Sequence, residues 1–77
     1  MSPLQQWRQM RGLTQSDLAA QCGLDRSIVS LIENGQKLMP ASLAAFLESI
    51  TPGLADEQQR HYANRRRRIK KMLSEAA

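Results

Sequence analysis

The fold of this 77-residue chain is decided by residues 13–35, which read LTQSDLAAQCGLDRSIVSLIENG. Thr14 and Asp17 have the spacing of a capping box, in which the Thr14 oxygen accepts from the Asp17 amide while the carboxylate accepts from the Thr14 amide. Apolar residues follow at helical spacing until Gly23, and a second helical pattern begins shortly after it. The stretch therefore predicts two short helices separated by only a few residues.

These two helices are predicted to meet in one small core. Asp25 is placed to cap the second helix, and Asn34 and Gly35 are placed to end it. Ala19 is small enough to permit a close approach of the helices, and Gly23 supplies the positive φ that a tight turn requires. The side chains expected to meet in the core are Leu18, Ala19, Val29 and Ile32.

Glycine and proline divide the rest of the chain into short apolar-periodic segments that are poor in β-branched residues. Ser2 and Pro3 predict a helix start, and this helix is expected to run to about Arg11. Pro40 opens a helix with a broad apolar face, which residues 51–53 close, and a fifth helix follows. The predicted fold class is a compact all-α domain of five helices.

The positive charge lies almost entirely at the C-terminal end. The net charge is +4, yet residues 1–64 hold five basic residues against six acidic ones. The remaining basic residues are Arg65, Arg66, Arg67, Arg68, Lys70 and Lys71. Such a run predicts a polyanionic partner, either nucleic acid or an anionic membrane surface.

Length and composition exclude several classes of protein. A chain of 77 residues encloses only one small core, which excludes a second independent domain. Cys22 and His61 are single, so we expect no intramolecular disulfide, no metal site and no cofactor. The chain has neither a secretion-signal pattern nor an apolar stretch approaching about 18 residues. We therefore expect a soluble, cytoplasmic protein.

Residues 13–35 resemble the helix-turn-helix of the phage repressor and Cro family. The resemblance extends more loosely from about residue 4 to residue 50, and it implies a lambda-repressor-like domain that binds double-stranded DNA. We accordingly assign residues 1–53 to a helix-turn-helix core and residues 54–77 to a basic C-terminal helix. The positions that match in register are Gln15, Ala19, Gly23, Val29, Ile32, Asn34 and Gly35.

The resemblance implies that the exposed N-terminal face of the second helix of the motif enters the major groove. Arg26 has the donors for a guanine O6/N7 pair, worth about 1–3 kcal/mol of discrimination, whereas Gln15 either braces Arg26 or holds a phosphate. Leu31 either touches a thymine methyl group or belongs partly to the core. Asn34 either holds a phosphate or caps the helix. The positions implicated in DNA contact are Gln15, Arg26, Ser27, Ser30, Leu31 and Asn34.

Four further residues are expected to have structural roles: Arg8, Glu33, Ala19 and Gly23. Arg8 and Glu33 match a pair that is buried as an ion pair in some members of the family, and we expect it here. Breaking one partner of such a pair typically costs about 3–5 kcal/mol. Trp7 stands where the family places an aliphatic core residue, so it is predicted to lie in the core.

The C-terminal helix is predicted to act in dimerisation, in phosphate contact, or in both. If residues 55–75 form one continuous helix, one of its sides is apolar, and this side is expected to pair two subunits of a homodimer. Its members are Tyr62, Ile69, Met72, Leu73 and Ala76. The alternative is that the helix packs back on its own core. The arginines expected to hold phosphates are Arg65, Arg66, Arg67 and Arg68, with minor-groove insertion or simple solubility as alternatives.

The sequence thus predicts a sequence-specific transcriptional regulator, a dimeric phage-type or mobile-element repressor that reads a pseudo-palindromic operator. One alternative is an RNA-binding adaptor in which the arginine-rich helix does the binding. Another is a protein-interaction module, such as an antitoxin whose C-terminal helix caps a toxin. No enzyme is expected, because no set of nucleophile, base and metal ligands converges around His61.

Overall fold

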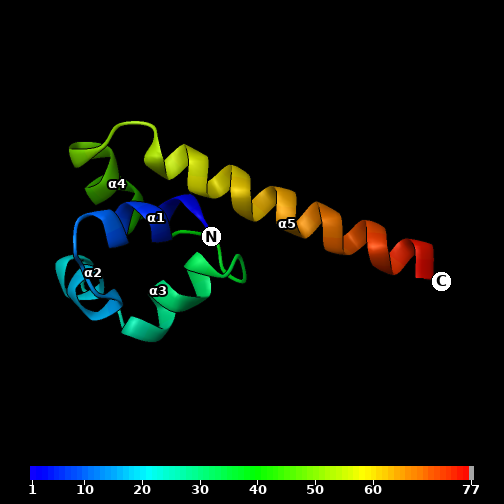
Figure 1. The fold of residues 1–77 in the computed structure, drawn as a ribbon, viewed down its shortest axis with the longest axis horizontal. Coiled ribbons are helices and arrows are strands. Elements are labelled where there is room, and N and C mark those ends of the chain that lie inside the picture. The colour runs from blue at the N-terminus through cyan, green and yellow to red at the C-terminus, as the bar shows by residue number, and fades with distance from the viewer. Residues whose placement is uncertain (77) are drawn as a thin grey trace.

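The computed structural model describes residues 1–76, and within them it contains five helices and no strand. The helices are α1 (Pro3–Met10), α2 (Gln15–Cys22), α3 (Arg26–Glu33), α4 (Ala41–Ile50) and α5 (Leu54–Ala76). Helices α1 to α4 gather at one end of the molecule, and α5 extends beyond them as a long arm (Figure 1). The molecule therefore measures 43 × 23 × 22 Å. The predicted all-α fold of five helices is confirmed.

Local capping interactions set the starts of the first two helices. The Ser2 Oγ accepts a hydrogen bond from the Gln5 amide at 3.2 Å. The Thr14 Oγ1 accepts from the Asp17 amide at 3.0 Å, and the Asp17 Oδ2 accepts from the Thr14 amide at 2.9 Å, which is the predicted capping box. Gly23 ends α2 in the left-handed region with φ 66°, a conformation that glycine adopts without steric cost.

Helix α3 begins without the side-chain cap that we expected. Asp25 occupies the cap position, but within residues 1–76 its side chain makes no capping hydrogen bond. Its backbone carbonyl still accepts from the Ile28 amide at 3.0 Å. The helix is held by burial of Val29 and Ile32 in the core, since tertiary packing stabilises short helices more than local signals do. The prediction of a side-chain cap at Asp25 was wrong.

Acid is expected to weaken the capping box of α2. Hydrogen bonds with the backbone and then the side chain of Thr14 hold the pKa of Asp17 below its ordinary value of 3.8. Because the pKa is depressed in the folded state, the ionised carboxylate stabilises the fold above this value, and the contribution is lost as the pH falls below it. Thermal unfolding of Asp17→Asn should therefore depend less on pH in this acid range than that of the wild type.

The control for this experiment is Asp25→Asn. Asp25 is the carboxylate at the start of the next helix, and within residues 1–76 it makes no side-chain cap bond. This variant should keep the acid dependence of the wild type. Equal acid curves for Asp17→Asn and the wild type would contradict the role of the capping box.

One hydrophobic core joins elements from the whole length of the fold. It includes the positions predicted from α2 and α3 and extends into the first turn of α5, past residue 53. Trp7 lies half-buried at the edge of this core, and its Nε1 donates to the Thr51 Oγ1 at 2.8 Å. The core residues are Leu4, Leu18, Ala19, Val29, Ile32, Met39, Leu43, Leu47, Leu54 and Ala55.

Gln58 fastens α5 to the two helices beneath it. Its side chain is buried, with 1% of the residue surface exposed. The Gln58 Nε2 donates to the Ile32 carbonyl at 3.0 Å, and the Oε1 accepts from the Leu4 amide at 2.9 Å. The Leu4 amide lies in the first turn of α1, where backbone N–H groups have no acceptor within their own helix. Gln58 therefore completes the hydrogen bonding of α1.

Candidate nucleic-acid interface

Helix α3 presents a mostly polar stripe on its outer face. Its opposite face is buried through Val29, Ile32 and Glu33. Leu31 is 38% exposed and is therefore a surface residue rather than a core residue. In Figure 1, α3 lies along the outer edge of the globule, on the side away from α5. The stripe consists of exposed Arg26, Ser27, Leu31 and Asn34, with Ser30 half-buried between them.

The first residue of α2 lies beside the start of α3. The Gln15 Oε1 accepts a hydrogen bond from the Arg26 Nη1 at 3.2 Å, which is the bracing contact that the sequence left as one alternative. The Gln15 Nε2 donates to the Glu33 Oε1 at 3.0 Å. Both ends of the Gln15 amide are therefore engaged, and the orientation of its amide group is fixed.

Arg8 and Glu33 form a buried ion pair beneath this surface. The Arg8 Nε lies 2.7 Å from the Glu33 Oε2, and the Arg8 Nη2 donates to the Glu33 Oε1 at 3.2 Å. The side chains are 10% and 1% exposed, respectively. The Arg8 Nη1 also donates to the Leu13 carbonyl at 2.8 Å, which holds the turn before α2. The pair is thus bidentate and has its own additional hydrogen bond, the geometry that such buried pairs require.

The ion pair and the polar stripe are joined into one hydrogen-bonded chain. It runs from the Arg8 guanidinium to the Glu33 carboxylate, then to the Gln15 amide and finally to the Arg26 guanidinium. Sequence reasoning had not connected Gln15 to Glu33. No periodicity signals this link, because the two residues lie 18 positions apart and act through their polar ends. The consequence is that an exposed arginine is held by an element of the buried core.

A family model of the helix-turn-helix matches residues 4–48, which is more than half of the chain. The chain belongs to the helix-turn-helix family. Helices α2 and α3 form its motif, with Gly23 in the turn between them. The family supports a DNA-binding regulator of the Cro and repressor type, and it is a family of DNA-binding domains rather than enzymes. Searches of curated proteins and of solved structures gave no significant match.

The four consecutive arginines of α5 lie beyond the helix-turn-helix match and point in different directions, since successive residues of an α-helix are about 100° apart. Arg65 lies against Gly35, in the turn after α3. Arg66 lies over the Tyr62 ring at 5.5 Å, and its Nε donates to the Tyr62 hydroxyl at 3.2 Å. Arg67 and the residue after it are exposed. The structure therefore brings only Arg65 to the end of the helix-turn-helix.

The apolar side expected on α5 is largely exposed. Ile69, Met72 and Leu73 are 38%, 63% and 68% exposed, and Tyr62 is half-buried. The side chain of Ala76, which was predicted to belong to this side, lies outside the described residues. Only the first turns of α5 pack on the helix-turn-helix core, through Leu54, Ala55 and Gln58.

Other chemical groups in the helix-turn-helix domain give no sign of a metal centre. Residues 1–76 contain no group of three or more His, Cys, Asp or Glu side chains that is arranged to hold a metal ion. Cys22 packs partly against the core, and this burial raises the pKa of its thiol. Within the same residues, none of the helices is both long enough and apolar enough to cross a membrane.

Proposed function

We propose that this protein is a sequence-specific transcriptional regulator of the Cro/repressor type, which acts in the cytoplasm and reads a pseudo-palindromic operator as a homodimer. The observation that carries the proposal is the outer stripe of α3, where Arg26 is exposed and braced by Gln15. Base readout requires side chains whose donors are held in position at a surface that fits the major groove. The α3 surface has both properties.

The dimensions of α3 suit the major groove. Its eight residues give a length of about 12 Å, close to the groove width of about 12 Å. Arg26 is at the start of the helix, the end that meets the base edges in this class of motif. Its guanidinium has five N–H donors, so the bond to Gln15 leaves enough for a bidentate pair with guanine.

The exposed side of α5 supports the dimer in this proposal. Ile69, Met72 and Leu73 lie on the part of α5 that projects from the domain (Figure 1). A small domain that leaves such side chains exposed gains stability by burying them against a second copy. Two copies related by a two-fold axis would place their α3 helices on half-sites about one DNA turn apart.

Selection from a random duplex pool tests the proposal directly. The wild-type protein is expected to select two inverted half-sites. Arg26→Ala should lose its preference at one base pair of each half-site by about 5- to 150-fold, which corresponds to the discrimination of one bidentate contact. Competition binding to selected and substituted duplexes measures this loss.

The matched control is Arg11→Ala. Arg11 is an exposed arginine of the α1 end that lies over the Trp7 ring at 4.7 Å, away from the α3 stripe. This variant should select the same half-sites as the wild type. Retention of the full base preference by Arg26→Ala would overturn the proposal. Tighter binding to RNA than to the selected duplex would replace it with the RNA-binding adaptor.

A further inference from the structure

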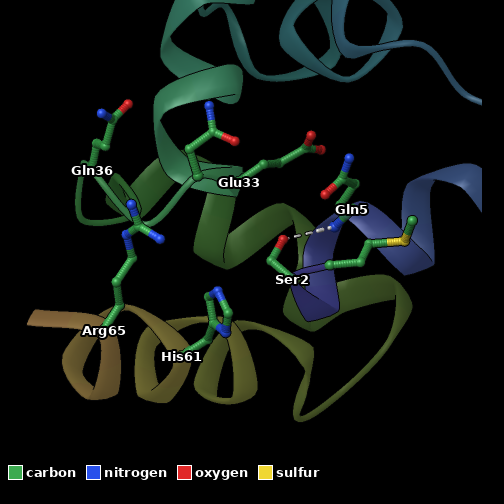
Figure 2. A pocket seen from close by; sticks show the side chains of 8 residues that line it. Ser2, Gln5, Glu33, Gln36, His61 and Arg65 are labelled. Carbon is green, nitrogen blue, oxygen red and sulfur yellow. Dashed lines mark hydrogen bonds between the residues drawn. The ribbon is translucent and has the colours of Figure 1, made fainter. Parts of the chain in front are cut away.

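A polar hollow separates the end of α3 from α5. Its volume is about 430 Å³, and its walls come from the start of α1, the end of α3, the turn after α3 and one side of α5. Figure 2 shows the His61 and Arg65 side chains pointing from α5 across this hollow, toward the segment that carries Glu33 and Gln36. Asn34 also lines it. The DNA-reading stripe of α3 therefore ends at the rim of a second polar surface.

Arg65 is held in place by a close approach to Gly35. A Cβ atom built on Gly35 would collide with the Cδ of Arg65 and would lie 3.2 Å from its Nε. Gly35 is buried and has φ +73°, so it serves both the turn that ends α3 and the packing of this side chain. The stem of Arg65 thus rests on the backbone, and its charged group is placed beside the turn before any ligand binds.

The charge of the hollow favours an anion. Glu33 is the only acidic residue in its wall, and Arg8 already neutralises that carboxylate. The Arg8–Glu33 pair is the one salt bridge among residues 1–76, so no carboxylate in that part of the chain neutralises Arg65. His61 and Asn34 add hydrogen-bond donors. A guanidinium beside neutral donors matches the geometry of a phosphate group.

The position of the hollow indicates which phosphate it meets. With Arg26 at the base edges, the other end of α3 lies about 12 Å away, a distance close to the width of the major groove. The Asn34 end of the helix therefore reaches the strand that borders the groove. We propose that the hollow binds a backbone phosphate of the operator, with Arg65 as the cationic ligand and Asn34 and His61 as neighbouring donors. This inference rests on the proposed function.

The proposal makes α5 part of the DNA interface, although the helix-turn-helix match ends at residue 48. It also separates Arg65 from the three arginines that follow it, because only Arg65 is fixed against the turn after α3. A phosphate held here adds affinity and sets the register of the protein on the duplex without reading a base.

Neutral methylphosphonate groups, placed one at a time along the selected operator, test the inference. In the wild type, one position per half-site should lower affinity about tenfold, the effect of one charge-assisted contact. In Arg65→Ala the same position should have no effect, and the salt dependence of binding should fall by about 0.9 per phosphate lost. Arg60→Ala, an exposed arginine on α5 outside the hollow, should keep the wild-type profile.

A glycine pair provides a second, independent variant. Gly35→Ala and Gly12→Ala both place a side chain at positive φ, +73° and +68°, but only the first collides with Arg65. Compared at a temperature where circular dichroism shows both variants folded, only Gly35→Ala should lose the sensitive phosphate position. Equal phosphate profiles for the two variants would contradict the role of the close approach.

The outcomes separate this inference from the proposed function. An unchanged phosphate profile in Arg65→Ala, together with a base preference that depends on Arg26, overturns the inference and leaves the regulator intact. Loss of the Arg26-dependent preference overturns both. Inorganic phosphate that perturbs the signals of His61 and Arg65, while no operator phosphate is sensitive to Arg65→Ala, assigns the hollow to a free anion and also overturns the inference. An effect of Arg65→Ala on RNA alone does the same.

Discussion

Replacing Arg8 with methionine is expected to leave most of the protein unfolded at room temperature. The substitution strands the Glu33 carboxylate, whose side chain is 1% exposed, without its cation. Breaking one partner of a buried pair costs about 3–5 kcal/mol. A core in a chain of this size seldom supplies more than about 3–5 kcal/mol, so the loss is as large as the stability itself. Far-UV circular dichroism and urea unfolding measure it.

Two variants control this experiment. Arg11→Met changes an exposed arginine three residues further along, and it should alter stability by less than about 0.5 kcal/mol. Arg8→Met combined with Glu33→Leu removes both charges and should restore folding, since apolar replacements of a buried pair are often neutral or stabilising. Wild-type stability of Arg8→Met alone would show that the pair does not hold the fold.

Replacing Gln58 with alanine is expected to be the next most damaging change. It removes the acceptor of the Leu4 amide and leaves that buried group unpaired, which costs about 1–3 kcal/mol. The emptied volume adds to this cost, because the Gln58 side chain is fully buried. The Ile32 carbonyl suffers less, since it also accepts from the Gly35 amide at 3.1 Å. Urea unfolding measures the total loss.

The amide of Leu4 gives a more specific measurement than global stability. Its hydrogen exchange should become faster in Gln58→Ala under conditions where the domain remains folded, because its only side-chain acceptor is gone. Gln59→Ala changes the next, half-buried residue of α5 and should leave that exchange rate as it is in the wild type. Slow exchange of Leu4 in Gln58→Ala would contradict the assigned hydrogen bond.

Features that depend on neighbours in sequence were predictable. The capping box of Thr14 and Asp17, the left-handed Gly23 and the shared core of α2 and α3 follow from spacing and residue type. The Arg8–Glu33 pair was expected from the family resemblance rather than from spacing. Asp25 shows the limit of local reasoning, because its residue type favours a cap whereas packing of α3 made one unnecessary.

Contacts between distant polar residues were not predictable. Gln58 is a polar residue in a polar helix, and nothing in its sequence context indicates burial between α1 and α3. The fit of Arg65 on Gly35 likewise depends on the angle at which α5 crosses the domain. Trp7 was predicted to lie in the core, but its bond to Thr51 keeps it at the edge, where the indole N–H has an acceptor.

The bond between Gln15 and Arg26 has a consequence for how the protein evolves. A new side chain at residue 26 that suits a different base pair also deprives Gln15 of its partner, and Gln15 in turn is bonded to Glu33. The effects of substitutions at these three positions are therefore not additive. New operator preferences would arise most readily through paired substitutions at residues 15 and 26, so few single mutations lead from one regulatory specificity to another.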